Sequence, residues 1–185
     1  MRGRIFVAID ASGPGEGHPL ATVSSGAEGV NWSARENLHI TLVYIGELTQ
    51  TVHEIAAKLE AISITPFELT LSGVGTFDLQ NGYSALYVGI EMTENLRLLQ
   101  QRCANAVSGF VLGCGNRTYK PHITVGLIKT AEIESIGSWK KRNITFKGNM
   151  PVSDFCLYSS HRTGVTVELD RLWQRSQTRP QRSVI

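Results

Sequence analysis

Several features are scarce in this 185-residue chain, and each absence narrows the class of protein. There are three cysteines, Cys103, Cys114 and Cys156, and none forms a Cys-x-x-Cys pair or stands at ligand spacing from a histidine. Neither a disulfide framework nor a zinc site is therefore supported. No run approaches ~20 consecutive apolar residues, so no membrane-spanning helix is predicted. Asp10 interrupts the apolar N-terminal run, which favours a strand over a signal peptide, and we expect a cytoplasmic protein.

Charged residues are also few, at 18%, and they are unevenly distributed. Residues 1–139 carry nine Lys/Arg and thirteen Asp/Glu, whereas residues 140–185 carry nine and three, a net charge of +6. A basic C-terminal part suits RNA, and a solvated surface with a frayed tail explains it equally well. From Arg171 onward there are four arginines and no acidic residue, which predicts an irregular end. We assign residues 1–174 to a single domain and 175–185 to a basic tail, and we expect a monomer.

Hydrophobic periodicity predicts a mixture of strands and helices. Short apolar or alternating runs predict strands at 4–9, 30–32, 38–45, 67–71, 85–90, 120–128, 144–146, 152–158 and 165–169. Helices are predicted at 51–62, from Thr93 to 106, and after Thr130, each with a threonine as its N-cap. Residues 11–29 are rich in Gly, Ser and Pro and predict a loop. Because antiparallel hairpins alternate with helices, an α+β fold is favoured over a doubly wound parallel sheet.

Two of the predicted strands carry the same pattern, His-x-Thr inside an apolar run. In an extended strand, residues two apart point to one face, so His39 lies beside Thr41 and His122 beside Thr124. The two segments also share the intervening Ile, the aliphatic residue after Thr and a later Ile, and each precedes a predicted helix. A strand–turn–helix unit used twice predicts two pseudo-equivalent lobes with a cleft between them.

The His-x-Thr pattern is a weak signal when it occurs once, because Ser and Thr together make up 30 of the 185 residues. A third match, His161-Arg-Thr163, is flanked by Ser159, Ser160 and Gly164, which predict a turn. No pleat would then align its two side chains, and we treat it as accidental. The first two matches differ because each lies in an apolar strand with a shared flanking pattern.

Two imidazoles and two hydroxyls around one cleft suit the chemistry of a phosphodiester. An imidazole can take or give a proton near neutral pH, so one histidine can serve as base and the other as acid. Threonine hydroxyls can donate hydrogen bonds to phosphate oxygens and stabilise the charge of the transition state. This chemistry needs no metal ion and no cofactor, and the sequence offers no carboxylate cluster that would hold a metal. A Ser-His-Asp hydrolase is disfavoured because no Gly-x-Ser-x-Gly motif is present.

An ordered set of motifs accompanies the two His-x-Thr strands. These motifs are Arg4–Asp10, Glu36–Leu42, Ile45–Glu47, Pro66–Phe67, Gly75-x-Phe77, Pro121–Thr124 and Leu157-Tyr158-x-Ser160. The set resembles the 2H phosphoesterase superfamily, and within it the RNA 2′,3′-cyclic phosphodiesterases once described as 2′-5′ RNA ligases (LigT/ThpR type). The resemblance implies two pseudosymmetric lobes, each an antiparallel sheet with flanking helices, and a central cleft. It also implies metal-independent opening of a 2′,3′-cyclic phosphate to a 2′-phosphomonoester, with reverse 2′-5′ ligation as a further activity.

The resemblance assigns roles to residues of the two motifs. His39 and His122 become the proton-transfer pair, and Thr41 and Thr124 hold the phosphate. To leave a 2′-phosphate, one histidine must activate water while the other protonates O3′. We assign His122 as the base and His39 as the acid.

Residues near the second motif are weaker candidates for the site. Lys120 and Tyr119 could bind substrate, the lysine through its charge and the tyrosine by stacking on a base. Equally, Lys120 could be an ordinary surface residue and Tyr119 a core aromatic, and we place Tyr44 in the core. The chain departs from the family at Leu127, where members often have an arginine, and at 11–29, where they usually have a helix.

These features leave three functional hypotheses. The leading one is hydrolysis of RNA terminal 2′,3′-cyclic phosphates or of small cyclic nucleotides. A second keeps the chemistry but acts on 2′-5′-linked or cyclic oligonucleotides, because both departures touch the rim of the cleft. The third is an RNA-end-binding module of a different class, suggested by the basic C-terminal part. None of the three involves a membrane or a metal.

Overall fold

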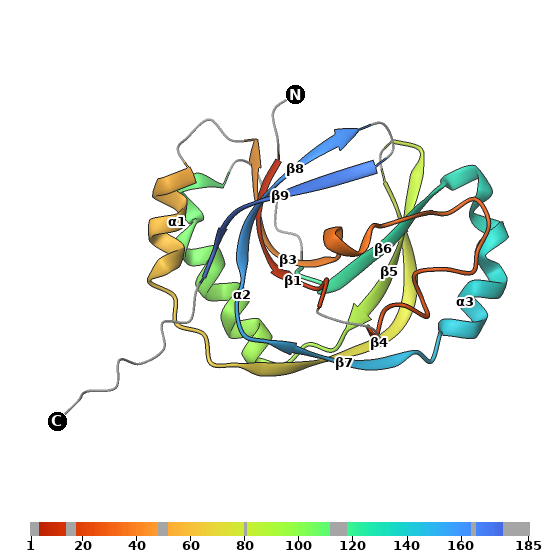
Figure 1. The fold of residues 1–185 in the computed structure, drawn as a ribbon, viewed down its shortest axis with the longest axis horizontal. Coiled ribbons are helices and arrows are strands. Elements are labelled where there is room, and N and C mark those ends of the chain that lie inside the picture. The colour runs from red at the N-terminus through yellow and green to blue at the C-terminus, as the bar shows by residue number, and fades with distance from the viewer. Residues whose placement is uncertain are drawn as a thin grey trace.

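The computed structural model describes residues 4–13, 18–47, 52–79, 81–111, 118–163 and 166–175 (Figure 1). Its strands are β1 (Arg4–Asp10), β2 (Asn31–Trp32), β3 (His39–Glu47), β4 (Phe67–Asp78), β5 (Tyr83–Ile90), β6 (His122–Lys129), β7 (Lys147–Val152), β8 (Cys156–Thr163) and β9 (Thr166–Gln174). Its helices are α1 (Val52–Glu60), α2 (Glu94–Ala106) and α3 (Gly137–Asn143), with the 3-10 turns η1 (Arg35–Asn37), η2 (Ser108–Phe110) and η3 (Thr130–Ile136). No helix in these ranges is long and apolar enough to cross a membrane.

The strands form one curved sheet that falls into two halves. The strand order is β7-β4-β5-β6-β3-β1-β8-β9, every pairing is antiparallel, and β2 adds to β6. Helices α1 and α2 lie beside the half that contains β3, whereas η3 and α3 lie beside the half that contains β6 (Figure 1). The predicted α+β fold with two lobes is confirmed.

The two halves meet where β3 pairs with β6. Ile40 lies opposite Ile123 in this antiparallel pairing, and both side chains are completely buried. A single hydrophobic cluster runs through both halves and includes these two residues. Residues 153–155 provide a second connection, because they lead directly from the edge strand β7 of one half into β8 of the other. The lobes are therefore parts of one core rather than separate units.

The first two predicted helices are present, and one predicted cap is confirmed. The Thr93 hydroxyl accepts a hydrogen bond from the backbone N–H of Leu96 at 3.3 Å, which satisfies an exposed donor at the start of α2. Leu96, Leu99 and Cys103 are buried on one face of this helix, as their spacing predicts. Helix α1 begins at Val52, and its predicted cap, Thr51, lies outside the described residues.

The third predicted cap is wrong. The chain after β6 forms the 3-10 turn η3, whose N-cap position is Lys129, and no side chain caps it. Thr130 is already engaged, because its hydroxyl forms a hydrogen bond with Ser84 Oγ on β5 at 3.0 Å. Ser84 is completely buried, so this contact satisfies a polar group inside the sheet.

Three predicted boundaries near the C-terminus are also wrong. Residues 144–146 form a turn after α3 rather than a strand, and Ile144 is 53% exposed. The strand predicted at 152–158 is interrupted at 153–155. Arg171, which we assigned to an irregular end, belongs to β9, where it pairs with Tyr158 of β8. Arg175 donates a hydrogen bond to the Ile62 carbonyl at 3.0 Å, and the rest of the assigned tail lies outside the described residues.

The loop predicted at 11–29 has neither helix nor strand among its described residues. It nevertheless contributes to the core, because Leu20 and Val23 are completely buried. The indole N–H of Trp139 in α3 donates to the Val23 carbonyl at 3.2 Å, which attaches the loop to the half that contains β6. The loop therefore bridges from the end of β1 to the opposite lobe.

The β3–β6 contact gives a stability prediction. Ile40→Ala leaves a cavity at the junction of the two lobes, and we expect it to lower the free energy of unfolding by about 2–5 kcal/mol in chemical denaturation. Ile144→Ala removes the same atoms from an exposed position, and it should change that free energy by less than about 0.5 kcal/mol. If both substitutions lowered the free energy of unfolding equally, the β3–β6 junction would contribute no more to stability than an exposed position does.

Candidate active site

The β3–β6 pairing brings the two His-x-Thr motifs together on one face of the sheet. Ile40 and Ile123 are opposite one another, so continuing the antiparallel register by one residue sets His39 opposite Thr124 and Thr41 opposite His122. Neighbouring residues of a strand point to opposite faces, and the two isoleucines are in the core. The four polar side chains therefore share the other face, where each is partly exposed.

Both histidines are oriented by the same backbone contact. His39 Nδ1 lies 2.7 Å from the carbonyl oxygen of Asn37, and His122 Nδ1 lies 2.8 Å from that of Lys120. A carbonyl oxygen can only accept, so Nδ1 carries the hydrogen in both rings. Nε2 is therefore the atom of each ring that can take up or release a proton. In both motifs the accepting carbonyl belongs to the residue two positions before the histidine.

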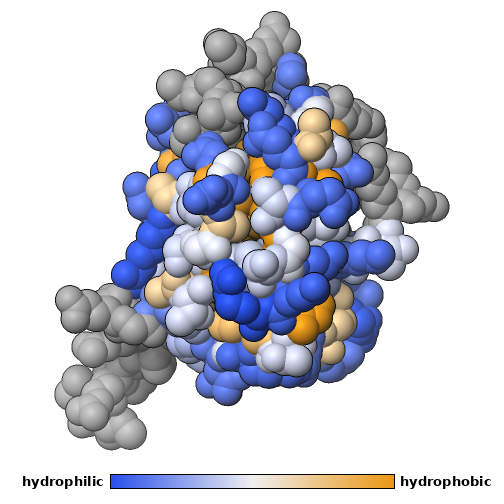
Figure 2. All heavy atoms as spheres, turned by 90° about the vertical axis from the view of Figure 1, so that its right-hand side faces the viewer, coloured by the Kyte–Doolittle hydropathy of each residue, from blue (hydrophilic) through white to orange (hydrophobic). Residues whose placement is uncertain are grey.

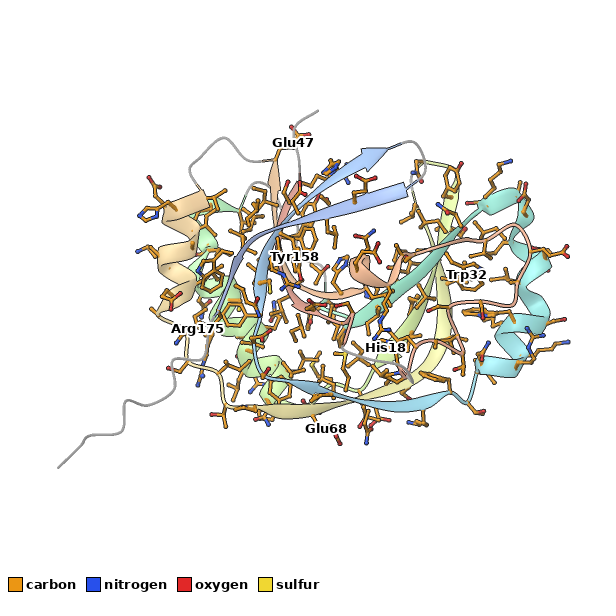
Figure 3. All side chains as sticks on the ribbon, in the orientation of Figure 1. His18, Trp32, Glu47, Glu68, Tyr158 and Arg175 are labelled. Atoms are coloured by element: carbon orange, nitrogen blue, oxygen red, sulfur yellow. The ribbon has the colours of Figure 1, made fainter. Side chains whose placement is uncertain are left out.

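Aromatic rings surround His39. The ring centroid of Phe6 on β1 is 4.9 Å from that of His39, and the ring of Tyr158 on β8 is 6.5 Å away. Phe6 and Tyr158 stack on each other at 5.7 Å and, with Ala8 and Cys156, form a small buried cluster separate from the main core. Tyr158 lies near the centre of the molecule (Figure 3). This cluster keeps water from one side of the imidazole.

The second histidine has an equivalent pair of rings. Phe77 on β4 lies 5.3 Å from the His122 ring and Tyr87 on β5 lies 5.5 Å from it, both nearly edge-on. Gly75 makes this arrangement possible, because a Cβ there would overlap the Tyr87 ring. Phe77 is 38% exposed, so this wall is more open than the one at His39. The sequence contains Gly75-x-Phe77 and Tyr158 as motif residues, but it does not reveal that they contact the histidines.

Burial changes the electrostatics of His39. Loss of hydration lowers the pKa of His39 below its usual 6.5, and this effect dominates. The hydrogen bond to the Asn37 carbonyl and the charge of Asp10 raise that pKa, while the charge of His122 lowers it further. A charge on His122 thus disfavours a charge on His39.

An ion pair lies beside His39 that sequence reasoning missed. Asp10 is the register partner of His39 in the β1–β3 ladder, and its Oδ1 accepts from the backbone N–H of Ser12 at 2.8 Å. Its other oxygen is bound by the guanidinium of Arg171, whose Cζ lies 5.8 Å from the centre of the Tyr158 ring. Arg171 is 161 residues from Asp10 along the chain, so only the fold reveals the pair.

The weaker sequence candidates occupy different places. The Lys120 side chain is exposed, and its carbonyl group positions His122. Tyr119 packs against the main core with its hydroxyl buried, and burial raises its pKa. Leu127 is half-buried opposite Asn31 of β2. Tyr44, which we expected in the core, is 38% exposed, so that expectation is wrong. A register shift between Val7 and Ala8 breaks the alternation of β3 and places Tyr44 opposite Phe6.

The third His-x-Thr match lies away from this face. The predicted turn is wrong, because β8 extends through Thr163 and pairs with β9. His161 Nε2 is 3.1 Å from Glu168 Oε2, and His161 Nδ1 is 3.5 Å from Asp170 Oδ2. The ring is thus held in exposed ion pairs on the β8–β9 hairpin.

Among the residues described, no three His, Cys, Asp or Glu side chains are grouped so that they could hold a metal ion.

Known proteins resemble this chain along most of its length. Residues 19–164 match the model of the 2′-5′ RNA ligase superfamily. The RNA 2′,3′-cyclic phosphodiesterase of Archaeoglobus fulgidus is 30% identical over 163 residues, which are 85% of this chain and 90% of that protein. The protein of the same name from Thermotoga maritima is 31% identical over 143 residues, 73% of each.

Solved structures share the fold. E. coli LigT complexed with 3′-AMP superimposes with a TM-score of 0.69 at 22% identity, covering 94% of this chain and 97% of LigT. The protein TT0787 of Thermus thermophilus has a TM-score of 0.72 at 21% identity, covering 93% and 96%. Together with the paired His-x-Thr strands, these matches show that the chain belongs to the 2′-5′ RNA ligase superfamily of 2H phosphoesterases.

Proposed function

We propose that this protein is a metal-independent RNA 2′,3′-cyclic phosphodiesterase, which opens a cyclic phosphate to a 2′-phosphomonoester. The observation that carries the proposal is the pair His39 and His122, in the same tautomer and on one face with Thr41 and Thr124. Relatives of that name at about 30% identity support the substrate class. The ligands would be RNA ends or small cyclic nucleotides.

The burial of His39 supports a division of roles opposite to the one expected from the sequence. A general base must be neutral before it acts, and loss of hydration favours the neutral form of His39. His122 lies beside the more open wall, where Phe77 is partly exposed. We therefore assign His39 as the base and His122 as the acid.

The reaction then follows in one displacement at phosphorus. His39 Nε2 takes a proton from water, whose oxygen bonds to phosphorus while the bond from phosphorus to O3′ breaks. His122 Nε2 gives its proton to O3′, which leaves the phosphate on O2′. The hydroxyls of Thr41 and Thr124 donate hydrogen bonds to the phosphate oxygens and stabilise the charge that develops there. With a 5′-hydroxyl in place of water as the attacking group, the same displacement would form a 2′-5′ linkage.

A basic surface favours the RNA-end-binding module as the second candidate. Lys140, Lys141 and Arg142 form the last turn of α3, and all three are exposed. This end of the molecule is largely hydrophilic (Figure 2). Cations clustered in this way attract the phosphates of RNA through salt-sensitive contacts.

We also propose that the protein acts as a monomer in the cytoplasm. The free, buried Cys103 and Cys156 support the reducing compartment.

An activity assay tests the proposed catalytic pair. In EDTA, the protein should convert cytidine 2′,3′-cyclic phosphate to cytidine 2′-phosphate. His39→Ala and His122→Ala should each lower kcat by about 10²–10⁴-fold, because each removes a proton-transfer group. His161→Ala, in the third His-x-Thr match, should leave kcat within about twofold. Chromatography that resolves 2′- and 3′-phosphates provides the measurement.

Two results would contradict the proposal. One is turnover that persists in both catalytic variants. The other is no turnover by the natural sequence combined with tight RNA binding that survives in the double variant, which would establish the binding module instead. Loss of activity in EDTA that is restored by a divalent cation would contradict the metal-independent mechanism.

A further prediction concerns the pKa of His39. Because the base must be neutral, kcat/KM should fall as the pH drops through the pKa of His39, and this acid limb should lie below 6.5. Asp10→Asn removes a charge that raises this pKa, so the His39 titration measured by NMR should move to still lower pH. Asp170→Asn alters the carboxylate beside His161 and should leave His39 unchanged. A His39 pKa above 6.5 would reverse the assigned roles.

A further inference from the structure

A carboxylate lies beside the imidazole that we assign as the base, but its partners are elsewhere. Asp10 is the register partner of His39 in the β1–β3 ladder, so both side chains are on one face with their Cβ atoms about 4.5–5.5 Å apart. A carboxylate at this distance can reach Nε2 of the ring. Among the described residues, however, the ion pair of Asp10 is with Arg171 and not with His39.

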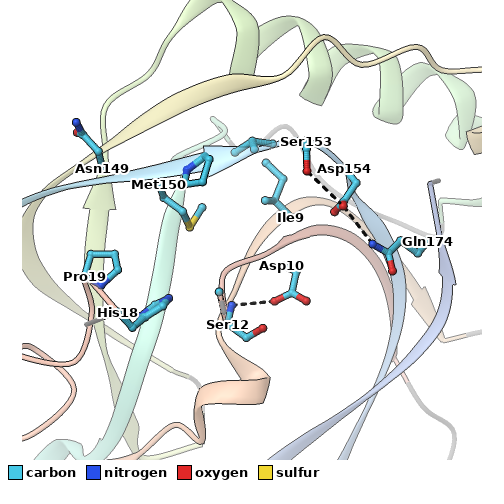
Figure 4. Close-up of a pocket in the computed structure, with 13 residues that line it drawn as sticks. Ile9, Asp10, Ser12, His18, Pro19, Asn149, Met150, Ser153, Asp154 and Gln174 are labelled. Carbon is cyan, nitrogen blue, oxygen red and sulfur yellow. Dashed lines mark hydrogen bonds between the residues drawn. The ribbon is translucent and has the colours of Figure 1, made fainter. Parts of the chain in front are cut away.

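Two donors occupy the two oxygens of the Asp10 carboxylate. The backbone N–H of Ser12 donates to Oδ1 at 2.8 Å (Figure 4), and the guanidinium of Arg171 binds Oδ2. Asp10 also borders a cavity of about 640 Å³, so close packing does not fix the direction of its carboxylate. The contacts with Ser12 and Arg171 fix it instead.

Arg171 is itself held in a defined position. It lies opposite Tyr158 in the β8–β9 pairing, and its Cζ is 5.8 Å from the centre of that ring. Its Nη1 donates to Gln174 Oε1 at 3.1 Å. Gln174 Nε2 in turn donates to Asp154 Oδ2 at 3.1 Å (Figure 4). The guanidinium is therefore held over the same ring that lies near His39.

Release of Asp10 from Arg171 would change the protonation of His39. Nδ1 of the His39 ring already donates to the Asn37 carbonyl, so Nε2 can donate to a carboxylate only after it has taken up a proton. A free carboxylate beside the ring would stabilise this protonated form as an ion pair. A base that already carries its proton cannot take another from water.

We propose that Arg171 is a positioning residue, which binds the Asp10 carboxylate so that it does not form an ion pair with His39. Nε2 of His39 then stays available to take a proton from water. The inference rests on the proposed function, in which His39 is the base, and it adds a residue that lies outside both His-x-Thr motifs. Arg171 acts through Asp10, without contact with the substrate.

The other groups around His39 do not replace Asp10 in this role. Besides Asp10 and Arg171, the titratable or charged residues that adjoin His39 are Tyr158 and Cys156 on β8, His122 on β6, and Arg35 and Glu36 of η1. Burial raises the pKa of Tyr158 and Cys156, so both are uncharged near neutral pH. Arg35 donates to the Ser12 carbonyl at 2.7 Å. Asp10 supplies the carboxylate charge that raises the pKa of His39.

NMR titration of the histidine ring protons tests the inference, with the His39 signal identified by its loss in His39→Ala. Arg171→Gln should raise the His39 pKa by about 1 unit, because an unpaired carboxylate beside the ring favours its protonated form. The acid limb of kcat/KM should move up with it. At a pH below that limb kcat/KM should fall about tenfold, whereas above the limb it should stay within about twofold.

Four further variants control this experiment. Arg171→Lys keeps a positive charge beside Asp10 and should keep the natural pKa of His39. The double variant Asp10→Asn/Arg171→Gln should show no rise, because no carboxylate remains to pair. Arg97→Gln breaks an exposed pair with Glu94 on α2 and, as the matched control, should leave the pKa unchanged. Arg171→Met should raise the pKa as Arg171→Gln does, and it serves if Arg171→Gln does not fold.

The outcomes separate this inference from the proposed function. An unchanged His39 pKa in folded Arg171→Gln, or a rise that persists in the double variant, would overturn it. An equal increase in KM at every pH without a change in the pKa would also overturn it and make Arg171 a phosphate-binding residue. If the natural sequence opens no cyclic phosphate but Arg171→Gln raises the pKa, the control of His39 by Arg171 stands and the proposed function fails.

Discussion

The active face depends on one contact, the antiparallel pairing of Ile40 with Ile123 between β3 and β6. These side chains are completely buried in a core that both lobes share, so the hydrophobic effect holds the two strands in register. If one of the two strands slipped by one residue, its His-x-Thr pair would turn into the core and its isoleucine out to solvent. The cost of burying two polar groups in this way opposes such a slip, and the geometry of the candidate catalytic pair follows from the packing beneath it.

The two halves repeat the same local device but place it in different surroundings. Each imidazole donates from Nδ1 to a carbonyl two residues upstream and lies against two aromatic rings. At His39 the rings belong to a buried cluster, whereas at His122 one of them is exposed. Pseudosymmetry therefore supplies two similar groups in different surroundings, and under our proposal this difference lets His39 accept a proton while His122 donates one.

The wall on the His39 side contains an ion pair between distant parts of the chain. Asp10 is the register partner of His39 in the β1–β3 ladder and binds Arg171 of β9. Arg171 supplies a positive charge near the face that carries His39, in a chain that has Leu127 where the family resemblance led us to expect an arginine. It does not substitute for that residue directly, because the Asp10 carboxylate already partners it.

The sequence by itself determined the elements whose signals are local. The strand pattern around His39 and His122, the Thr93 cap and the loop at 11–29 follow from side-chain alternation, a capping hydroxyl and backbone preference, and the structure has them as expected. Only the tertiary structure decided what depends on distant partners. Thr130 bonds to Ser84 instead of capping a helix, and Arg171 joins a strand because β8 pairs with it. The burial of His39 likewise arises from rings on β1 and β8, which no local pattern reveals.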